Sequence, residues 1–150
     1  MKYLELHQWG ETVSITVQVG YYMEGNLAIT LMGWEEDGPE PWNTLTVNLD
    51  GIREKDCAFV DVNNNGQEIL AWILRNGLGV PTGRIGYSGY CSYPEYRYKT
   101  EKLRELDLDG YEEYSRIYKS FHSCKSVRNA KDRQNGGNGW FSHRIVQIKK

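Results

Sequence analysis

Thr12-Val13-Ser14-Ile15-Thr16-Val17-Gln18-Val19 is the stretch of sequence that decides the fold. Its apolar side chains fall at every second position, and Thr, Ser and Gln occupy the positions between them. Successive side chains of a strand point to opposite faces, so this pattern predicts a β-strand with one buried face and one solvent-facing face. The β-branched residues that fill the stretch favour the same conformation.

Further strands are expected on both sides of this stretch. Residues 2–8 read as a first strand that reaches it through a turn at 9–11. Residues 26–34 and 42–49 also alternate, and the acidic segment 35–41 between them, with its Gly and two Pro, reads as a loop. These four strands predict an antiparallel meander with one buried face.

The remainder of the chain mixes strands and helices. Asn65 and Glu68 have the spacing of a capping box, so we expect a helix to begin at Asn65 and to end at Gly77. A second helical pattern covers residues 111–124. The other expected elements are strands at 58–60, 90–99 and 140–148 and a Gly/Asn loop at 135–139.

Together these elements predict an α+β fold. We expect a curved antiparallel sheet of five or six strands with one packed helix and a helical C-terminal extension. A chain of 150 residues suits one domain, so residues 1–150 are predicted to form a single unit. Within it, residues 1–98 form the core and residues 99–150 a basic extension.

Charge is divided unevenly along the chain. Residues 1–115 carry 9 Lys+Arg and 19 Asp+Glu, a net charge of −10, whereas residues 116–150 carry 9 Lys+Arg and one acid, a net charge of +8. The two parts either attract each other or provide a basic tail that binds phosphates, and the sequence leaves both open. The residues of such an anion-binding tail are Lys125, Arg128, Lys131 and Arg133.

The composition indicates a cytoplasmic protein. No apolar run approaches the length of about 20 residues that a membrane span needs, and the N-terminal residues do not resemble a signal peptide. The three cysteines are widely spaced and odd in number, which argues against a disulfide framework and against a Cys-x-x-Cys metal site. We therefore expect no metal, no cofactor and no membrane contact.

The glycine-rich segment Gly83-Arg84-Ile85-Gly86-Tyr87-Ser88-Gly89 is the strongest candidate for a binding site. It matches neither the dinucleotide-binding fingerprint nor a Walker loop. Glycines nevertheless let backbone N–H groups approach an anion closely, and an arginine adds a charged hydrogen-bond donor. The predicted ligand-binding residues are Thr82, Gly83, Arg84, Gly86, Tyr87, Ser88 and Tyr90. The alternative is a turn that needs positive φ angles before an edge strand.

Other patterns favour structural roles. Residues 61–66 begin like a calcium-binding loop, but Trp72 occupies the position of the essential glutamate, so turn and capping chemistry explains them better. Five tyrosines between residues 87 and 98 are interleaved with cations, which suits base stacking, yet a tyrosine-rich edge strand is the favoured reading. The scattered histidines give no nucleophile context, so no catalytic residue is assigned and no enzyme is expected.

One segment carries a family resemblance: Pro81-Thr82-Gly83-Arg84-Ile85-Gly86-Tyr87-Ser88-Gly89-Tyr90-Cys91-Ser92-Tyr93-Pro94-Glu95-Tyr96. With segments 25–29, 42–49 and 57–64, it resembles a family of small uncharacterised proteins, a domain of unknown function, from gut bacteria and their phages and mobile elements. The likeness covers roughly residues 1–98, and relatives often end soon after the Tyr-Pro-x-Tyr motif, so the basic extension is a departure. The resemblance implies an accessory protein that counters host defence by binding.

The leading functional hypothesis is therefore a non-enzymatic protein that binds and sequesters an anionic ligand, with a nucleotide immune signal as the expected class. One alternative is a protein-binding inhibitor of a host defence effector, of the anti-CRISPR type, whose acidic body mimics nucleic acid. The other is nucleic-acid binding through the basic tail. The sequence leaves the oligomeric state open, a homo-oligomer included.

Overall fold

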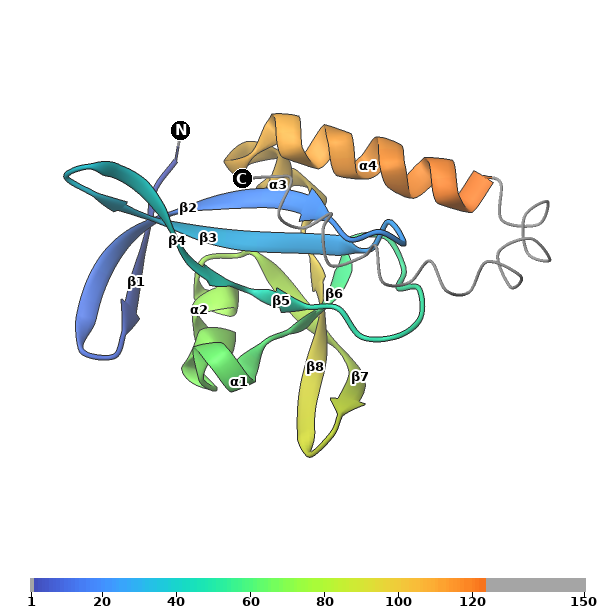
Figure 1. The fold of residues 1–150 in the computed structure, drawn as a ribbon, viewed down its shortest axis with the longest axis horizontal. Helices are drawn as coiled ribbons and strands as arrows, with labels where there is room; N and C mark the ends of the chain where they lie inside the picture. The colour runs from blue at the N-terminus through green and yellow to red at the C-terminus, as the bar shows by residue number, and fades with distance from the viewer. Residues whose placement is uncertain (1, 124–150) are drawn as a thin grey trace.

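The computed structural model describes residues 2–123, and their first third forms an antiparallel sheet. Its strands follow chain order: β1 (Leu4–Gln8), β2 (Glu11–Tyr21), β3 (Leu27–Glu35) and β4 (Gly38–Thr44) (Figure 1). The alternating stretch lies in β2, where Val13, Ile15, Val17 and Val19 are buried as predicted. The predicted antiparallel meander order is confirmed, with β4 in place of the strand expected at 42–49. The expected single buried face is not, because Thr16 of β2 and every residue from 27 to 33 of β3 are buried.

A second antiparallel sheet follows, with the order β5-β6-β8-β7. Its strands are β5 (Thr46–Val47), β6 (Cys57–Val60), β7 (Gly79–Ser88) and β8 (Cys91–Tyr98). The α+β class is correct, but the expected single sheet of five or six strands is replaced by two sheets of four.

The two sheets separate at Leu45, which interrupts the strand expected at 42–49. The Leu45 N–H donates to the carbonyl of Ile29 in the first sheet at 2.9 Å, and its carbonyl accepts from the N–H of Asp61 at 2.8 Å. The Leu45 side chain is fully buried between the elements it joins. Alternation therefore continues through 42–49 in the sequence although the strand changes partners within it.

Residues 35–41 are mostly strand, not the loop that was expected. β4 begins at Gly38 and pairs with β3, so only Glu36 and Asp37 form the turn. β4 is an edge strand, and its outer side leaves backbone positions unpaired. Pro39 and Pro41 are tolerated there because a missing N–H costs no ladder bond on that side.

Four helices complete the described chain: α1 (Val62–Asn65), α2 (Glu68–Arg75), α3 (Thr100–Leu106) and α4 (Leu108–Ser123). The capping box predicted for Asn65 is wrong, because Asp61 caps α1 by accepting from the N–H of Asn64, and Asn65 lies inside that helix. α2 begins after Gln67 without a side-chain cap. Gly77, with φ of +66°, follows the end of α2 as predicted.

The helical extension docks on the first sheet. α4 lies across β2 (Figure 1), and an Asp107 carboxylate oxygen accepts from the N–H of Val19 at 2.9 Å. Tyr111 and Tyr114 of α4 are buried and join a hydrophobic core shared with both sheets and α2. The expected strand at 140–148, the loop at 135–139 and the tail residues Lys125, Arg128, Lys131 and Arg133 lie outside the described residues.

Within the described part of the chain, no helix combines the length and the apolar character that crossing a bilayer requires.

Candidate functional site

The glycine-rich segment forms strand β7, not a free loop. β7 pairs with β8 from Gly79 to Pro81 and again from Ile85 to Ser88, and a bulge separates the two parts. β7 lies at the edge of the second sheet, while the tyrosine-rich β8 lies between β6 and β7. The expectation of an edge position for the tyrosine-rich strand is therefore wrong, and Tyr93, Tyr96 and Tyr98 belong to the core instead.

Each glycine of the motif has a structural reason in this hairpin. Gly83 has φ of +94° within the bulge, and Gly89 has φ of +60° in the two-residue turn before β8. Residues other than glycine rarely adopt such φ angles. At Gly86 the reason is space, because a Cβ would lie 2.5 Å from Leu49 Cδ1 and 2.9 Å from Phe59 Cε1. The positive φ angles of the alternative interpretation are present at Gly83 and Gly89, but the segment is itself the edge strand, not a turn before one.

Two of the predicted ligand-binding residues converge on a buried carboxylate of β8. Arg84 Nε and Thr82 Oγ1 each donate to Glu95 Oε1 at 2.7 Å. Glu95 is 3% exposed, whereas the Arg84 side chain is 56% exposed. Hydrogen bonding to Glu95 raises the pKa of the Arg84 guanidinium. Arg84 therefore already has an anionic partner within the protein.

Glu54 extends this cluster to the chain segment before β6. Its Oε1 lies 2.7 Å from Arg97 Nη2 and 3.8 Å from Arg84 Nη2. The hydrogen bond from Arg97 is the main cause of the lowered pKa of Glu54. Arg84 and Arg97 thus connect the hairpin to the segment before β6 through Glu54, while Arg84 also pairs with Glu95 inside the hairpin.

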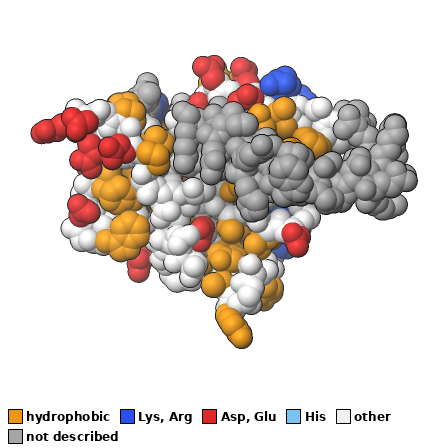
Figure 2. All heavy atoms as spheres, viewed as in Figure 1, with side chains coloured by type: hydrophobic (Ala, Val, Ile, Leu, Met, Phe, Trp, Pro, Cys, Tyr) orange, Lys and Arg blue, Asp and Glu red, His pale blue; other side chains and the backbone are white. Residues whose placement is uncertain are grey.

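The end of the hairpin projects from the molecule and is aromatic. Figure 1 shows β7 and β8 extending away from the rest of the fold, and Figure 2 shows exposed hydrophobic side chains at that end. Tyr87 is 72% exposed, Ile85 is 55% exposed, and Tyr90 in the turn is fully exposed. Exposed aromatic residues grouped on one feature are typical of binding surfaces.

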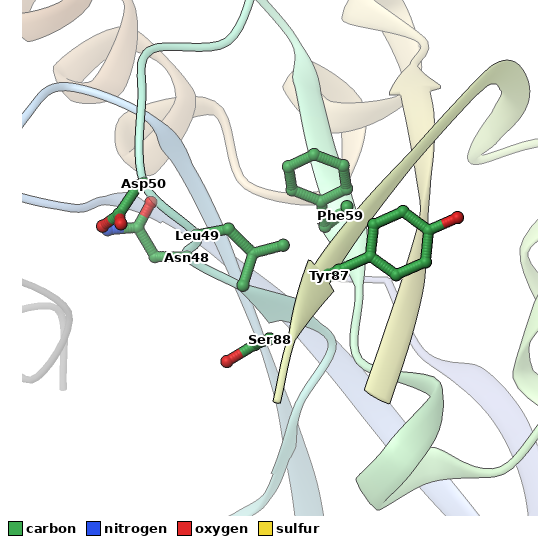
Figure 3. Close-up of a pocket in the computed structure, with 7 residues that line it drawn as sticks. Asn48, Leu49, Asp50, Phe59, Tyr87 and Ser88 are labelled. Carbon is green, nitrogen blue, oxygen red and sulfur yellow. The ribbon is translucent and has the colours of Figure 1, made fainter. Parts of the chain in front are cut away.

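A pocket of about 280 Å³ lies beside the outer part of this hairpin, between residues 86–88 and the segment 48–50 (Figure 3). Leu49, Phe59 and Gly86 form its apolar part, and Asn48, Asp50 and Ser88 its polar part. In Figure 3 the Ser88 side chain extends toward the side of Asn48 and Asp50, whereas the Tyr87 ring extends from the other side of the strand.

Charge around the pocket is negative at its surface. Asp50 is exposed, and the Asn48 side chain donates to Glu24 at 3.2 Å. Arg53 lies beneath, with its guanidinium 4.9 Å from the Phe59 ring centroid and donating to the carbonyls of Leu49 and Gly51. Burial lowers the pKa of Arg53. This cation closes the 49–53 turn, and Asp50, which lines the pocket, is one of the acidic groups whose charge acts on it.

The structure thus divides the predicted site residues among three places. Thr82 and Arg84 meet at Glu95, with Gly83 between them in the bulge. Gly86, Tyr87 and Ser88 border the pocket, and Tyr90 lies alone in the hairpin turn. Sequence reasoning missed Asn48, Leu49, Asp50 and Phe59. The Asp50-Gly51 pair is a turn signal that places a loop there, but nothing in the sequence indicates that this loop packs on Gly86.

Metal chemistry finds no support in residues 2–123, where no three His, Cys, Asp or Glu side chains gather at metal-binding distance. Asp61, which begins the calcium-like motif, accepts from both the N–H and the side-chain amide of Asn64. The favoured reading of that motif as capping and turn chemistry therefore describes the structure.

Fold and site together define a class: a two-sheet α+β protein that presents an aromatic hairpin above a small acidic pocket. Within that class, the chain belongs to the family described as a domain of unknown function, DUF4313, whose model matches residues 16–118. The match ends inside α4, not near residue 98, so both C-terminal helices lie in the family domain up to that point. Comparison with curated proteins and with solved structures finds no match.

Proposed function

We propose that this protein is a non-enzymatic accessory protein of a phage or mobile genetic element of gut bacteria, and that it acts by binding a host protein. The genomic setting follows the family resemblance of the sequence. The mode of action follows from one observation: Tyr87 and Tyr90 are exposed on a hairpin whose base is held by the Arg84–Glu95 ion pair. Rigid exposed tyrosines supply large contact area at a small cost in side-chain entropy.

Charge indicates the kind of partner. Residues 2–123 carry 11 Lys+Arg and 19 Asp+Glu, a net charge of −8. An acidic body attracts a basic surface and speeds association with it, and salt screens that attraction. A basic, nucleic-acid-binding surface of a host defence effector is the partner class that suits both the charge and the accessory role.

Site-specific photocrosslinking in the native host tests this proposal. A photoreactive phenylalanine replaces Tyr90 in one strain and Leu74, which is 50% exposed on α2, in a control strain. We expect a discrete protein adduct from position 90 that is absent from position 74 and weakens as salt rises. The absence of a position-specific adduct, or the same adduct from both positions, would contradict the proposal.

Sequestration of a nucleotide by residues 82–90 stays a prediction with less support, because Arg84 is paired with Glu95 and Asp50 opposes an anion at the pocket. Native mass spectrometry of the full chain with linear and cyclic nucleotides tests it. Ser88→Leu would obstruct the pocket, and Ser92→Leu is its control on the opposite face of the same hairpin. A stoichiometric adduct lost only in Ser88→Leu would favour sequestration, and no adduct would reject it.

A further inference from the structure

The outer edge of β7 exposes backbone hydrogen-bonding groups. Ser88 and Cys91 close a two-residue hairpin, and such a closing pair exchanges ladder hydrogen bonds. Hydrogen-bonded and non-hydrogen-bonded pairs then alternate, so Ile85 and Tyr87 occupy non-hydrogen-bonded pairs. Ile85 lies opposite Pro94, which has no N–H to donate, in agreement with this register. The N–H and C=O groups of Ile85 and Tyr87 therefore point away from β8 at the sheet edge.

The other edge strands of the described chain are protected against pairing. β4 carries Pro39 and Pro41, β5 has only two residues, and β1 carries the charged Glu5. Short strands, prolines and charges are the usual means by which proteins block an edge. The first part of β7 has similar protection in Pro81, Arg84 and the bulge between Pro81 and Ile85. Only residues 85–88 beyond the bulge carry no charge and no proline, so this end of the edge is left open to pairing.

The two faces of this edge differ. Ile85 and Tyr87 form an exposed apolar face, whereas Gly86 and Ser88 face the pocket that Asp50 borders and to whose lining Tyr87 also contributes. Side chains of an added strand alternate in the same way. Those on one face would contact Ile85 and Tyr87, and one on the other face would reach the pocket beside Asp50.

We infer that residues 85–88 of β7 pair with an extended segment of the partner protein, and that a Lys or Arg of this segment occupies the pocket beside Asp50. This inference rests on the proposed function and names its binding mode as strand addition, in which backbone bonds supply affinity and pockets supply specificity. The pocket's apolar part accommodates the aliphatic stem of a Lys or Arg, and Asp50 pairs with its charge.

NMR titration of the full chain with blocked pentapeptides tests the inference. Thr-Val-Lys-Val-Thr presents two valines on one face and lysine on the other, and Thr-Val-Glu-Val-Thr is its control. We expect the lysine peptide to shift the amides of Ile85 and Tyr87 and to slow their hydrogen exchange, and to bind about fivefold more tightly than the glutamate peptide. Asp50→Asn should remove this preference. No response of these two amides at millimolar peptide would overturn the inference.

Two variants separate backbone pairing from side-chain contact. Tyr87→Pro removes an N–H that faces away from β8. The hairpin should therefore keep its backbone hydrogen bonds between β7 and β8 but no longer bind the peptide. Tyr87→Ser loses the ring but keeps the N–H, so the Ile85 and Tyr87 positions should still respond. Equal binding by both variants would contradict strand addition.

Failure of the inference can be told from failure of the proposed function. Position 90 could crosslink a partner while the Ile85 and Tyr87 amides of that complex exchange hydrogen as fast as in the free chain. In that case the proposed binding of a host protein is supported and strand addition is wrong. If these amides are already protected in the free chain, the edge is occupied by the chain's own residues or by a second copy, and a partner segment is excluded.

Discussion

Arg84 and Glu95 form an ion pair of 2.7 Å in which the carboxylate is buried and the guanidinium faces solvent. The pair joins the bulge of β7 to β8, at the point where the ladder between these strands is interrupted. A buried carboxylate needs its partners, because an uncompensated charge away from water is costly. The bulge is therefore held by a side-chain contact where backbone pairing is missing.

Arg84→Ala should lower the stability of the protein more than the loss of an ion pair of equal length at the surface. The matched control is Lys2→Ala, because Lys2 lies 2.7 Å from Glu105, which is 39% exposed. Exposed ion pairs contribute little, so the control should unfold at nearly the wild-type urea concentration. Equal urea midpoints for the two variants would show that Glu95 does not depend on Arg84.

Gly86→Ala should destabilise the protein by about 1–3 kcal/mol, the usual cost of overpacking a filled site. The added methyl group would collide with Leu49 and Phe59. Gly33→Ala is the control, because a Cβ there meets Trp42 at 3.4 Å and Val13 at 3.5 Å, which are ordinary contacts. Leu49→Ala combined with Gly86→Ala should cost less than the sum of the two single changes, as urea denaturation of all four proteins would reveal.

The amino-acid sequence allows the strands and helices to be predicted better than their partners. Alternation in β2 is local, and the buried valines follow from it directly. Residues 42–49 alternate just as well, yet the chain changes sheets at Leu45 because of hydrogen bonds to Ile29 and Asp61. Those partners are distant in sequence, so periodicity carries no information about them.

The candidate site shows the same limit. The three glycines at 83, 86 and 89 predict an unusual backbone conformation, and two of them do adopt positive φ. Gly86 instead makes room for Leu49 and Phe59, which no local pattern shows. The charge of Arg84 likewise suggests an anionic ligand. In the structure its guanidinium already donates to the carboxylate of Glu95, 11 positions further along the chain.

Cys57 should resist alkylation in the folded protein. Burial raises the pKa of the Cys57 thiol from 9.0 to about 11, which lowers its thiolate fraction at pH 8 by about a hundredfold. Cys91, at the start of β8, is half-buried and should react before Cys57. Iodoacetamide labelling followed by peptide mass mapping would compare the two sites. Comparable labelling of both cysteines before urea is added would contradict the buried position of Cys57.

Alkaline pH should loosen the docking of α4 through Tyr111. Its hydroxyl donates to the buried carboxylate of Asp56 at 2.8 Å, and Asp56 also donates its N–H to the Tyr114 oxygen. Burial, followed by the bond to Asp56, raises the pKa of Tyr111 from 10.0 to about 12. A raised pKa means that the unfolded chain releases this proton first. The stability from Tyr111 is therefore complete below pH 10 and is lost as the pH rises towards 12.

Urea denaturation between pH 8 and about 11.5 measures this loss, which one such group limits to about 1.4 kcal/mol per pH unit. Tyr111→Phe should be less stable at pH 8, because Asp56 loses a donor, but should show a shallower decline above pH 10. Burial also raises the pKa of Tyr98 and Tyr114, so some decline remains in this variant. Tyr90→Phe alters a fully exposed ring and should leave the decline unchanged. Parallel declines in wild type and Tyr111→Phe would mean that the Asp56 contact does not respond to pH.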